Sequence, residues 1–539
     1  MRRLLLLICL LSGAVSLPGA AGDFPGTDDK WQHFQAPNFE LYSRIREADA
    51  RELLHNLELL RAMFLDFFKL KERRRLEVTV YAFKSEKDFK TYGSETYGAK
   101  HQFDGFYVGG TDRAVIYLIQ GEDAATTRQL IFHEYIHHLF RVAEQNPPPW
   151  LNEGMAELFS TIVPRSDQKL EFGRPAAGRL WQLQQSTFMP LEQLFAVEQS
   201  SAIFRQGEHT GLFYAESWAL LHYLFFGDSK IEPERRRLFI ALVLANSFRD
   251  AAHQRQGFRE VFGMDYPEML ARLKTYTTGG KYFWGMHPAP SIPPATSYVR
   301  RAVPEREIRL RLAELALRVS RSPAAKLMLL QAAEQDPADT RPLEVLGADA
   351  LRDQDELRAR ERWSRAAELQ TSNPAIYREL GLMEGRAVFS QFDIAYRVPA
   401  EKGQRMRDYL LRSIAYNPEQ TAAYEMLAWV EAFAQEPSIT NLNVIQRAYP
   451  NLSRKERTGL ALAFVRLRLN NNAEALEILA DLETMRPDAW ETYGIEAIRA
   501  KIEGRPMRHE DPPPNSAPEA ARVRVAPPKI SKPATRDNR

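Results

Sequence analysis

The chain has 539 residues and nearly balanced charge, with 72 Lys and Arg against 70 Asp and Glu. This balance excludes the strong excess of basic residues that is typical of nucleic-acid-binding proteins. The length predicts about three domains, each large enough to bury its own core.

The first 22 residues have the pattern of a signal peptide. Arg2 and Arg3 precede an apolar run over residues 4–11, and small residues follow over 18–22. This run is too short to span a bilayer and no later stretch is long enough, so we expect no transmembrane helix. Cys9, the only cysteine, lies within the run. We therefore expect an exported protein without disulfides, in a bacterial periplasm or secreted.

Residues 23–125 are expected to form an α/β lobe in which strands and helices alternate. Alternating apolar residues predict strands, and an amphipathic pattern between the first two predicts a helix. Gly109-Gly110-Thr111-Asp112 predicts the turn of a hairpin. The expected strands cover 38–44, 76–83, 103–108 and 114–119, and the expected helix covers 53–68.

The next segment, residues 126–285, is expected to be mainly helical and carries His133-Glu134-Tyr135-Ile136-His137, an HEXXH motif. Two histidines four residues apart lie one turn apart on one face of a helix, so both imidazoles can bind one metal ion. Glu134 can then act as a general base toward a water on that metal. The pattern favours one zinc ion, which makes such a water acidic and polarises a carbonyl group. His138 points about 100° away from His137 and is not expected to be a ligand.

A second helix is expected to begin near Trp150, because Pro147, Pro148 and Pro149 end the first one. On this second helix Glu153 and Glu157 lie one turn apart. The histidine pair and the glutamate pair can therefore face each other.

The two segments His133-Glu134-x-x-His137 and Trp150-Leu151-Asn152-Glu153-Gly154-x-Ala156-Glu157 together resemble the gluzincin zinc peptidases, above all the peptidase MA-like bacterial proteins. The resemblance implies an α+β zincin-like domain, with a mixed sheet lobe and a helical lobe, that hydrolyses peptide bonds. It also implies a role for each motif residue: zinc ligands His133, His137 and Glu153, general base Glu134, and supporting residues Glu157 and Asn152, which orient the first and second histidine.

Tyr214 is the candidate for stabilising the oxyanion of the reaction. It lies in a helix-like run, residues 209–224, that resembles the tyrosine-containing helix of aminopeptidase N-like gluzincins. An equally open interpretation is a buried aromatic residue beside Trp218. His209 and His222 are weaker candidates for a catalytic role.

In gluzincins an edge strand before the motif helix pairs with the substrate backbone, and residues 114–119 are expected to be that strand. The expected substrate-binding residues are Ala114, Val115, Ile116 and Tyr117, with an ordinary sheet strand as the equally open alternative. The chain lacks the Gly-x-Met-Glu-Asn segment that captures a free N-terminus in aminopeptidase N-like members. That absence argues against an aminopeptidase.

Three further segments complete the chain. Residues 286–304 are expected to be a proline-rich linker. In residues 305–502, Leu343-x-x-Leu346-Gly347 and Tyr377-x-x-Leu380-Gly381 lie 34 residues apart and resemble the first helix of tetratricopeptide (TPR) repeats. Such repeats would form an all-α solenoid for a protein partner, whereas a plain helical bundle is the alternative. The proline-rich basic tail, 503–539, is expected to be disordered.

The sequence thus predicts an exported zinc metallopeptidase that acts on a peptide or protein substrate recruited by TPR-like repeats. One alternative is an HEXXH protease of outer-membrane assembly whose third ligand comes from much farther downstream. The other is a repeat-based binding scaffold, or an assembly and quality-control factor, with a weakly active or vestigial protease domain.

Overall fold

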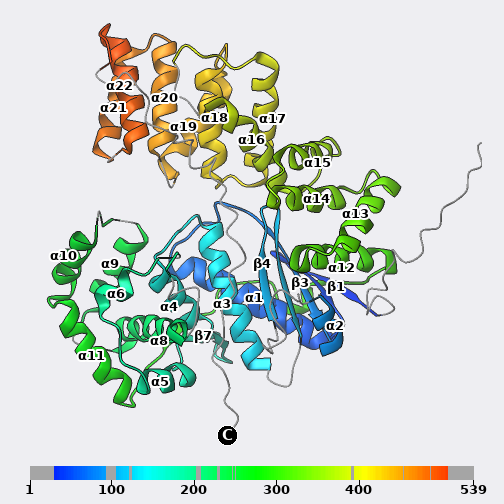
Figure 1. Ribbon diagram of the computed structural model, residues 1–539, viewed down its shortest axis with the longest axis vertical. Helices are drawn as coiled ribbons and strands as arrows, with labels where there is room; N and C mark the ends of the chain where they lie inside the picture. The colour runs from blue at the N-terminus through cyan, green and yellow to red at the C-terminus, as the bar shows by residue number, and fades with distance from the viewer. Residues whose placement is uncertain are drawn as a thin grey trace, which may run out of the picture.

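The computed structural model describes residues 30–92, 105–119, 124–198, 200–201, 208–227, 231–245, 247–248, 250–389, 394–452, 455–485 and 487–507. The expected signal peptide and nearly all of the expected tail lie outside these ranges. Within them the fold is a mixture of α and β, with a six-stranded sheet, a helical lobe and a long row of further helices (Figure 1). No helix in the described ranges has the length and apolar character needed to cross a membrane.

The six-stranded sheet has the order β4-β5-β3-β2-β1-β9. The neighbours β2, β3 and β5 run parallel, and the other neighbours are antiparallel. Helix α1 (Glu47–Phe67) makes the crossover from β2 to β3 that parallel strands need. The expected hairpin is confirmed, because β4 and β5 pair antiparallel. The strands are β1 (Gln32–Gln35), β2 (Phe39–Ser43), β3 (Glu77–Phe83), β4 (Gly105–Gly109), β5 (Arg113–Ile119) and β9 (Val299–Ala302).

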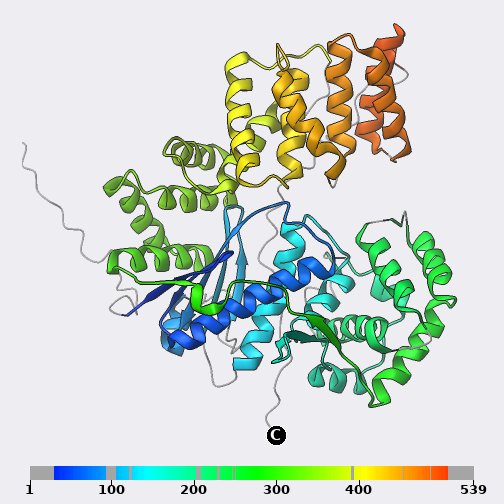
Figure 2. The ribbon, with the colours of Figure 1, turned by 180° about the vertical axis from the view of Figure 1, so that it is seen from behind.

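The two faces of this sheet are covered by different helices. Successive side chains of a strand point to opposite faces, and in β3 the residues Val78 and Val80 join the core formed with α1 and α3 (Ala124–Val142). Tyr81 and Phe83 join a second core on the other face, together with α2 (Glu86–Tyr92) and the first helices after β9. Figure 2 shows α1 crossing the face that lies opposite these later helices.

The helical lobe continues from α3 and surrounds α4 (Pro149–Phe159). Pro149 starts α4 without cost, since the first helical residue needs no backbone donor. A small antiparallel sheet, β6-β7-β8, belongs to the same lobe. Its strands are β6 (Val163–Pro164), β7 (Lys169–Phe172) and β8 (Gly285–Pro288), and the other elements are α5 (Ala177–Gln184), α6 (Leu191–Phe195), α8 (Glu208–His222), a π-helical turn (Tyr223–Gly227), α9 (Pro233–Leu244), α10 (Ala251–Phe262) and α11 (Tyr266–Thr278).

The prediction of a linker over 286–304 is wrong at both ends of the segment. Its first residues lie in β8, which pairs with β7, and residues Val299–Ala302 form β9, which pairs with β1. The segment therefore belongs to both sheets, because its free backbone groups complete two exposed strand edges.

The region after β9 is helical, as predicted, and nearly all of its consecutive helices contact each other. In Figure 1 the later ones stand side by side in a row above the rest of the molecule. Acidic side chains cap several of them, for example Asp488, whose side chain accepts from the backbone N–H of Glu491 in a capping box. The helices are α12 (Glu305–Ser320), α13 (Pro323–Gln335), α14 (Thr340–Arg352), α15 (Glu356–Glu368), α16 (Pro374–Phe389), α17 (Ala400–Tyr416), α18 (Thr421–Phe433), α19 (Ile439–Ala448), α20 (Glu456–Arg468), α21 (Asn472–Thr484) and α22 (Ala489–Glu503).

The first of these helices are joined to the sheet through a buried cluster of charges, which we call the junction cluster: Glu40, Asp112, Arg113, Glu314, Arg318, Arg341 and Glu344. Arg113 of β5 is 1% exposed and contacts Glu314 of α12 at 3.5 Å and Glu344 of α14. Arg318 donates to Asp112 in the β4–β5 turn at 3.0 Å. The helical region after β9 is thus fixed to the sheet rather than tethered by a flexible segment.

Candidate metal centre

Helices α3 and α4 lie against each other and carry all residues of the two sequence motifs. Gly154 in the second motif lets α8 approach α4 closely. A Cβ atom at Gly154 would lie 2.6 Å from the backbone oxygen of Ser217 on α8, so a side chain does not fit there. The glycine therefore brings α8, which carries Tyr214, directly against the motif helix.

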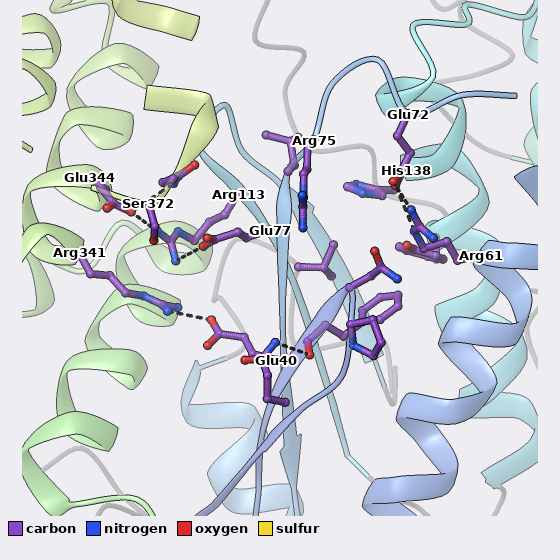
Figure 3. Close-up of a pocket in the computed structure, with 18 of the residues that line it drawn as sticks. Glu40, Arg61, Glu72, Arg75, Glu77, Arg113, His138, Arg341, Glu344 and Ser372 are labelled. Carbon is purple, nitrogen blue, oxygen red and sulfur yellow. Dashed lines mark hydrogen bonds and ion pairs between the residues drawn. The ribbon is translucent and has the colours of Figure 1, made fainter. Parts of the chain in front are cut away.

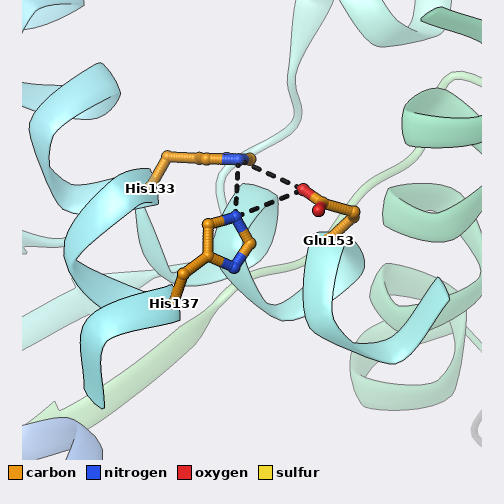
Figure 4. A group of neighbouring side chains, drawn as sticks. All are labelled: His133, His137 and Glu153. Carbon is orange, nitrogen blue, oxygen red and sulfur yellow. Dashed lines mark hydrogen bonds and ion pairs between the residues drawn. The ribbon is translucent and has the colours of Figure 1, made fainter. Parts of the chain in front are cut away.

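Three side chains from these helices converge at one point (Figure 4). The Nε2 atoms of His133 and His137 are 3.2 Å apart, and each lies 3.3 Å from Oε2 of Glu153. All three residues are buried or nearly so. The structure therefore brings together the three residues that the sequence singled out as ligands.

The chemistry of these three atoms fits a cation. Nδ1 of His137 lies 2.9 Å from Oδ1 of Asn152, and Nδ1 of His133 lies 3.5 Å from Oε1 of Glu157. If these Nδ1 atoms carry the protons, both Nε2 atoms present lone pairs toward each other and toward a carboxylate oxygen. Oε2 of Glu153 is buried and has no hydrogen-bond partner. Lone pairs facing one another repel, and a shared cation removes that repulsion.

The spacing of the three atoms also suits zinc. Ligands at about 2.0–2.1 Å from a tetrahedral ion lie roughly 3.3 Å from one another. The separations of 3.2 and 3.3 Å between the Nε2 and Oε2 atoms agree with that value. The donor set, two imidazoles and one carboxylate, is one that leaves a fourth position open.

The charges around the site are those expected beside a cation. Although burial opposes the imidazolium, the carboxylates of Glu153, Glu157 and Glu134 raise the pKa of His133 to about 9. Burial alone would raise the pKa of Glu153, but the two neighbouring histidines lower it by a larger amount. The resulting pKa lies well below the ordinary range. Without a metal the site would bind a proton instead, because the negative charge of its carboxylates favours a positively charged histidine.

Arg179 on α5 also contacts the site, although the sequence did not predict it as a site residue. Its Nε donates to Oε2 of Glu157 at 3.1 Å, and its guanidinium lies 5.5 Å from the centre of the Tyr214 ring. An arginine 22 residues after its glutamate belongs to no recognisable spacing, so only the packing of α5 could identify it. It holds Glu157 in its ionised form and in contact with His133.

Glu134 and Tyr214 are both close to the three converging residues. Glu134 is 7% exposed, and Tyr214 is 4% exposed with its ring centre 6.3 Å from that of His133. Burial, and then the charges of Glu153 and Glu134, raise the pKa of Tyr214. Its hydroxyl therefore stays protonated and able to donate a hydrogen bond.

The other histidines named in the sequence differ in their surroundings. His138 contacts the Tyr107 hydroxyl through Nδ1 at 2.8 Å, on another face of α3, in agreement with the prediction that it is not a ligand. Both ring nitrogens of His222 are occupied, by the Tyr276 hydroxyl at 2.7 Å and the Gly173 oxygen at 2.8 Å. His222 is thus a buried structural residue, and the side chain of His209 lies outside the described part.

The prediction of an edge strand over residues 114–119 is wrong. Strand β5 lies between β4 and β3, and both of its edges are used in pairing. Ala114, Val115, Ile116 and Tyr117 are at most 1% exposed and belong to the cores on the two faces of the sheet, so they cannot contact a substrate. The outer strand of the sheet is instead β4 (Gly105–Gly109), the other strand of the hairpin, and it packs along α3.

No protein-family model matches this chain, and no curated protein matches it either. The conclusions about the site therefore depend on its residues and their geometry.

Proposed function

We propose that this protein is a zinc-dependent metallopeptidase with a zincin-like catalytic domain. One observation carries the proposal: three lone-pair atoms, Nε2 of His133, Nε2 of His137 and the unpartnered Oε2 of Glu153, converge at separations that suit one tetrahedral ion. This arrangement would be unfavourable in a buried site that binds no cation.

The residues around the ion would divide the work of hydrolysis. Zinc bound there would supply Lewis acidity, which lowers the pKa of water and polarises the scissile carbonyl. Glu134 would take a proton from the attacking water and pass it to the amide nitrogen as the C–N bond breaks. The Tyr214 hydroxyl would donate a hydrogen bond to the oxyanion that forms on the carbonyl oxygen.

The proposal includes a place for the substrate backbone and for a larger partner. An extended peptide would add to the outer edge of β4, the strand that packs along α3. The helices from α16 onward, proposed as TPR-like repeats, would recruit a protein substrate. In that case a protein is cleaved with a lower KM than a short peptide that spans the same bond, whereas equal KM values would contradict recruitment.

The export that the N-terminal sequence predicts is also part of the proposal. A secreted or periplasmic protein is cut after its signal peptide. N-terminal sequencing of the protein from its native cell should give a start near residue 23, and an intact Met1 would contradict export.

Substitution of Glu134 by Gln tests the mechanism. The amide keeps the size of the side chain but cannot act as a base, so hydrolysis should fall by about 100- to 10,000-fold or more. Zinc content should stay at one ion per chain, since Glu134 is not among the three converging residues. Both quantities are measured on the purified full chain, by metal analysis and by mass spectrometry of cleaved peptides. Hydrolysis at the wild-type rate in this variant would refute the mechanism.

A further inference from the structure

A cavity of about 380 Å³ lies where strands β2 and β3, the far side of α3 and the repeat helix α14 meet (Figure 3). It reaches α3 through Tyr135 and His138, and none of the three converging residues of the metal centre lines it. Its volume is in the range of small-molecule sites. The cavity is therefore separate from the metal centre, although both border the same helix.

Most charges in the cavity wall already have partners. Glu40 accepts from Arg341 at 2.8 Å, and Glu344 pairs with Arg113 and also accepts from Thr340 at 3.0 Å. Arg61 pairs with Glu72. These groups satisfy one another across the wall, as structural ion pairs do.

Two charged side chains in the wall remain able to contact a ligand. Arg75 is exposed and has no hydrogen bond or ion pair to any residue that the structure describes. Glu77 has a side chain that is 41% exposed, and its one ion pair is a 3.3 Å contact with Arg113. Burial raises the pKa of Glu77 in spite of that arginine, so its ionised form would gain from another cation.

Arg75 lies two residues before Glu77, the first residue of β3. Figure 3 shows both side chains in the cavity wall, with Arg75 directed into the space beside Glu77. A dipeptide zwitterion has one charge of each sign at its two ends, and Arg75 and Glu77 place one charge of each sign in the same cavity wall.

We propose that this cavity binds a small zwitterion, of the class of free amino acids and short peptides, with its carboxylate on Arg75 and its ammonium group on Glu77. The paired charges of the wall orient the ligand through their remaining hydrogen-bonding capacity. The site goes beyond the proposed peptidase activity and does not depend on it, because binding requires neither zinc nor hydrolysis.

The test is calorimetric titration of dialanine into the full chain carrying Glu134→Gln, which prevents turnover. N-acetylated dialanine lacks the ammonium group, and C-amidated dialanine lacks the carboxylate. Each capped ligand should bind about 10-fold or more weakly than dialanine, the effect of losing one charged hydrogen bond. Equal binding of the capped and free ligands would overturn the proposal, as would no binding of dialanine at millimolar concentration.

Matched variants assign each charge to its residue. In Arg75→Gln the preference for a free carboxylate should disappear, while the preference for a free ammonium group remains. In Glu77→Gln the reverse should hold. Arg237→Gln is the control, since Arg237 is an exposed arginine on α9 outside the cavity and should leave binding unchanged. Binding that persists unchanged in Arg75→Gln and Glu77→Gln would place the peptide in the metal centre instead, and would overturn this site without affecting the peptidase proposal.

Discussion

The metal centre and the junction cluster are both buried groups of charged residues, but they satisfy their carboxylates in opposite ways. In the junction cluster every carboxylate contacts an arginine, for example Asp112 with Arg318 and Glu314 with Arg341. In the candidate metal centre Oε2 of Glu153 is buried, has no arginine or lysine among its described partners, and faces two imidazole nitrogens. A buried cluster that supplies its own cations is a structural joint, whereas one that lacks a cation at its centre points to an ion from outside.

This comparison predicts the largest loss of stability for breaking the joint. Arg113→Met removes the only arginine that the described residues place against the buried Glu344, and one of the three that contact Glu314. The free energy of unfolding should fall by about 3–5 kcal/mol, measured by urea denaturation. Arg309→Met is the control, because its partner Glu305 is 64% exposed and the pair should contribute only about 0–1 kcal/mol. Equal losses in the two variants would show that the junction cluster contributes no more to the free energy of unfolding than an exposed ion pair.

The metal centre should respond to zinc instead. An ion that binds only the folded chain stabilises it by about 4 kcal/mol at a concentration 1,000 times its Kd. Glu153→Ala should lose most of that gain together with the bound zinc, as measured by calorimetry and metal analysis. Glu58→Gln, a buried glutamate of α1 outside the centre, is the matched control and should keep both. Full zinc occupancy in Glu153→Ala would favour a ligand from farther downstream.

The side chains that orient the histidines should have a smaller effect. Asn152→Ala removes the acceptor at 2.9 Å from Nδ1 of His137 and should weaken zinc binding by about 10- to 100-fold. Asn152→Asp retains an acceptor oxygen and should restore most of the affinity. Competition with a coloured chelator measures both. A change of Asn152→Ala within about threefold of the wild type would contradict the orienting role.

The sequence predicted the parts of the molecule that local patterns determine. Helix α3 and the juxtaposition of His133, His137 and Glu153 follow from helical spacing within two short motifs. The position of β5 in the sheet could not be predicted, because strand order depends on which distant edges pair, and the hairpin placed β4 outside it.

The packing of distant segments was also beyond the sequence patterns. The proline-rich segment was expected to be a free linker, yet β8 and β9 add to two sheets whose open edges no local pattern reveals. Arg179 reaches Glu157 only because α5 packs against α8, which in turn packs against α4. The contact between α12 and the sheet depends on apolar residues that lie far apart in the sequence, such as Tyr81 and Ile308.

Glu216 on α8 differs from both groups, because it is a buried carboxyl group that keeps its proton. Its substitution is expected to have the smallest effect. It is fully buried and accepts from the Met189 backbone N–H at 2.6 Å, and burial raises its pKa to about 8. The folded chain therefore holds a proton there that the unfolded chain releases above about pH 4.5, so stability should fall as pH rises toward 8. Glu216→Gln cannot titrate, and from pH 6.5 to pH 8 it should lose about 1–2 kcal/mol less than the wild type. Urea denaturation at both pH values measures this difference, with the exposed Glu305→Gln as control. Parallel curves for wild type and Glu216→Gln would show that Glu216 is ionised in the folded chain.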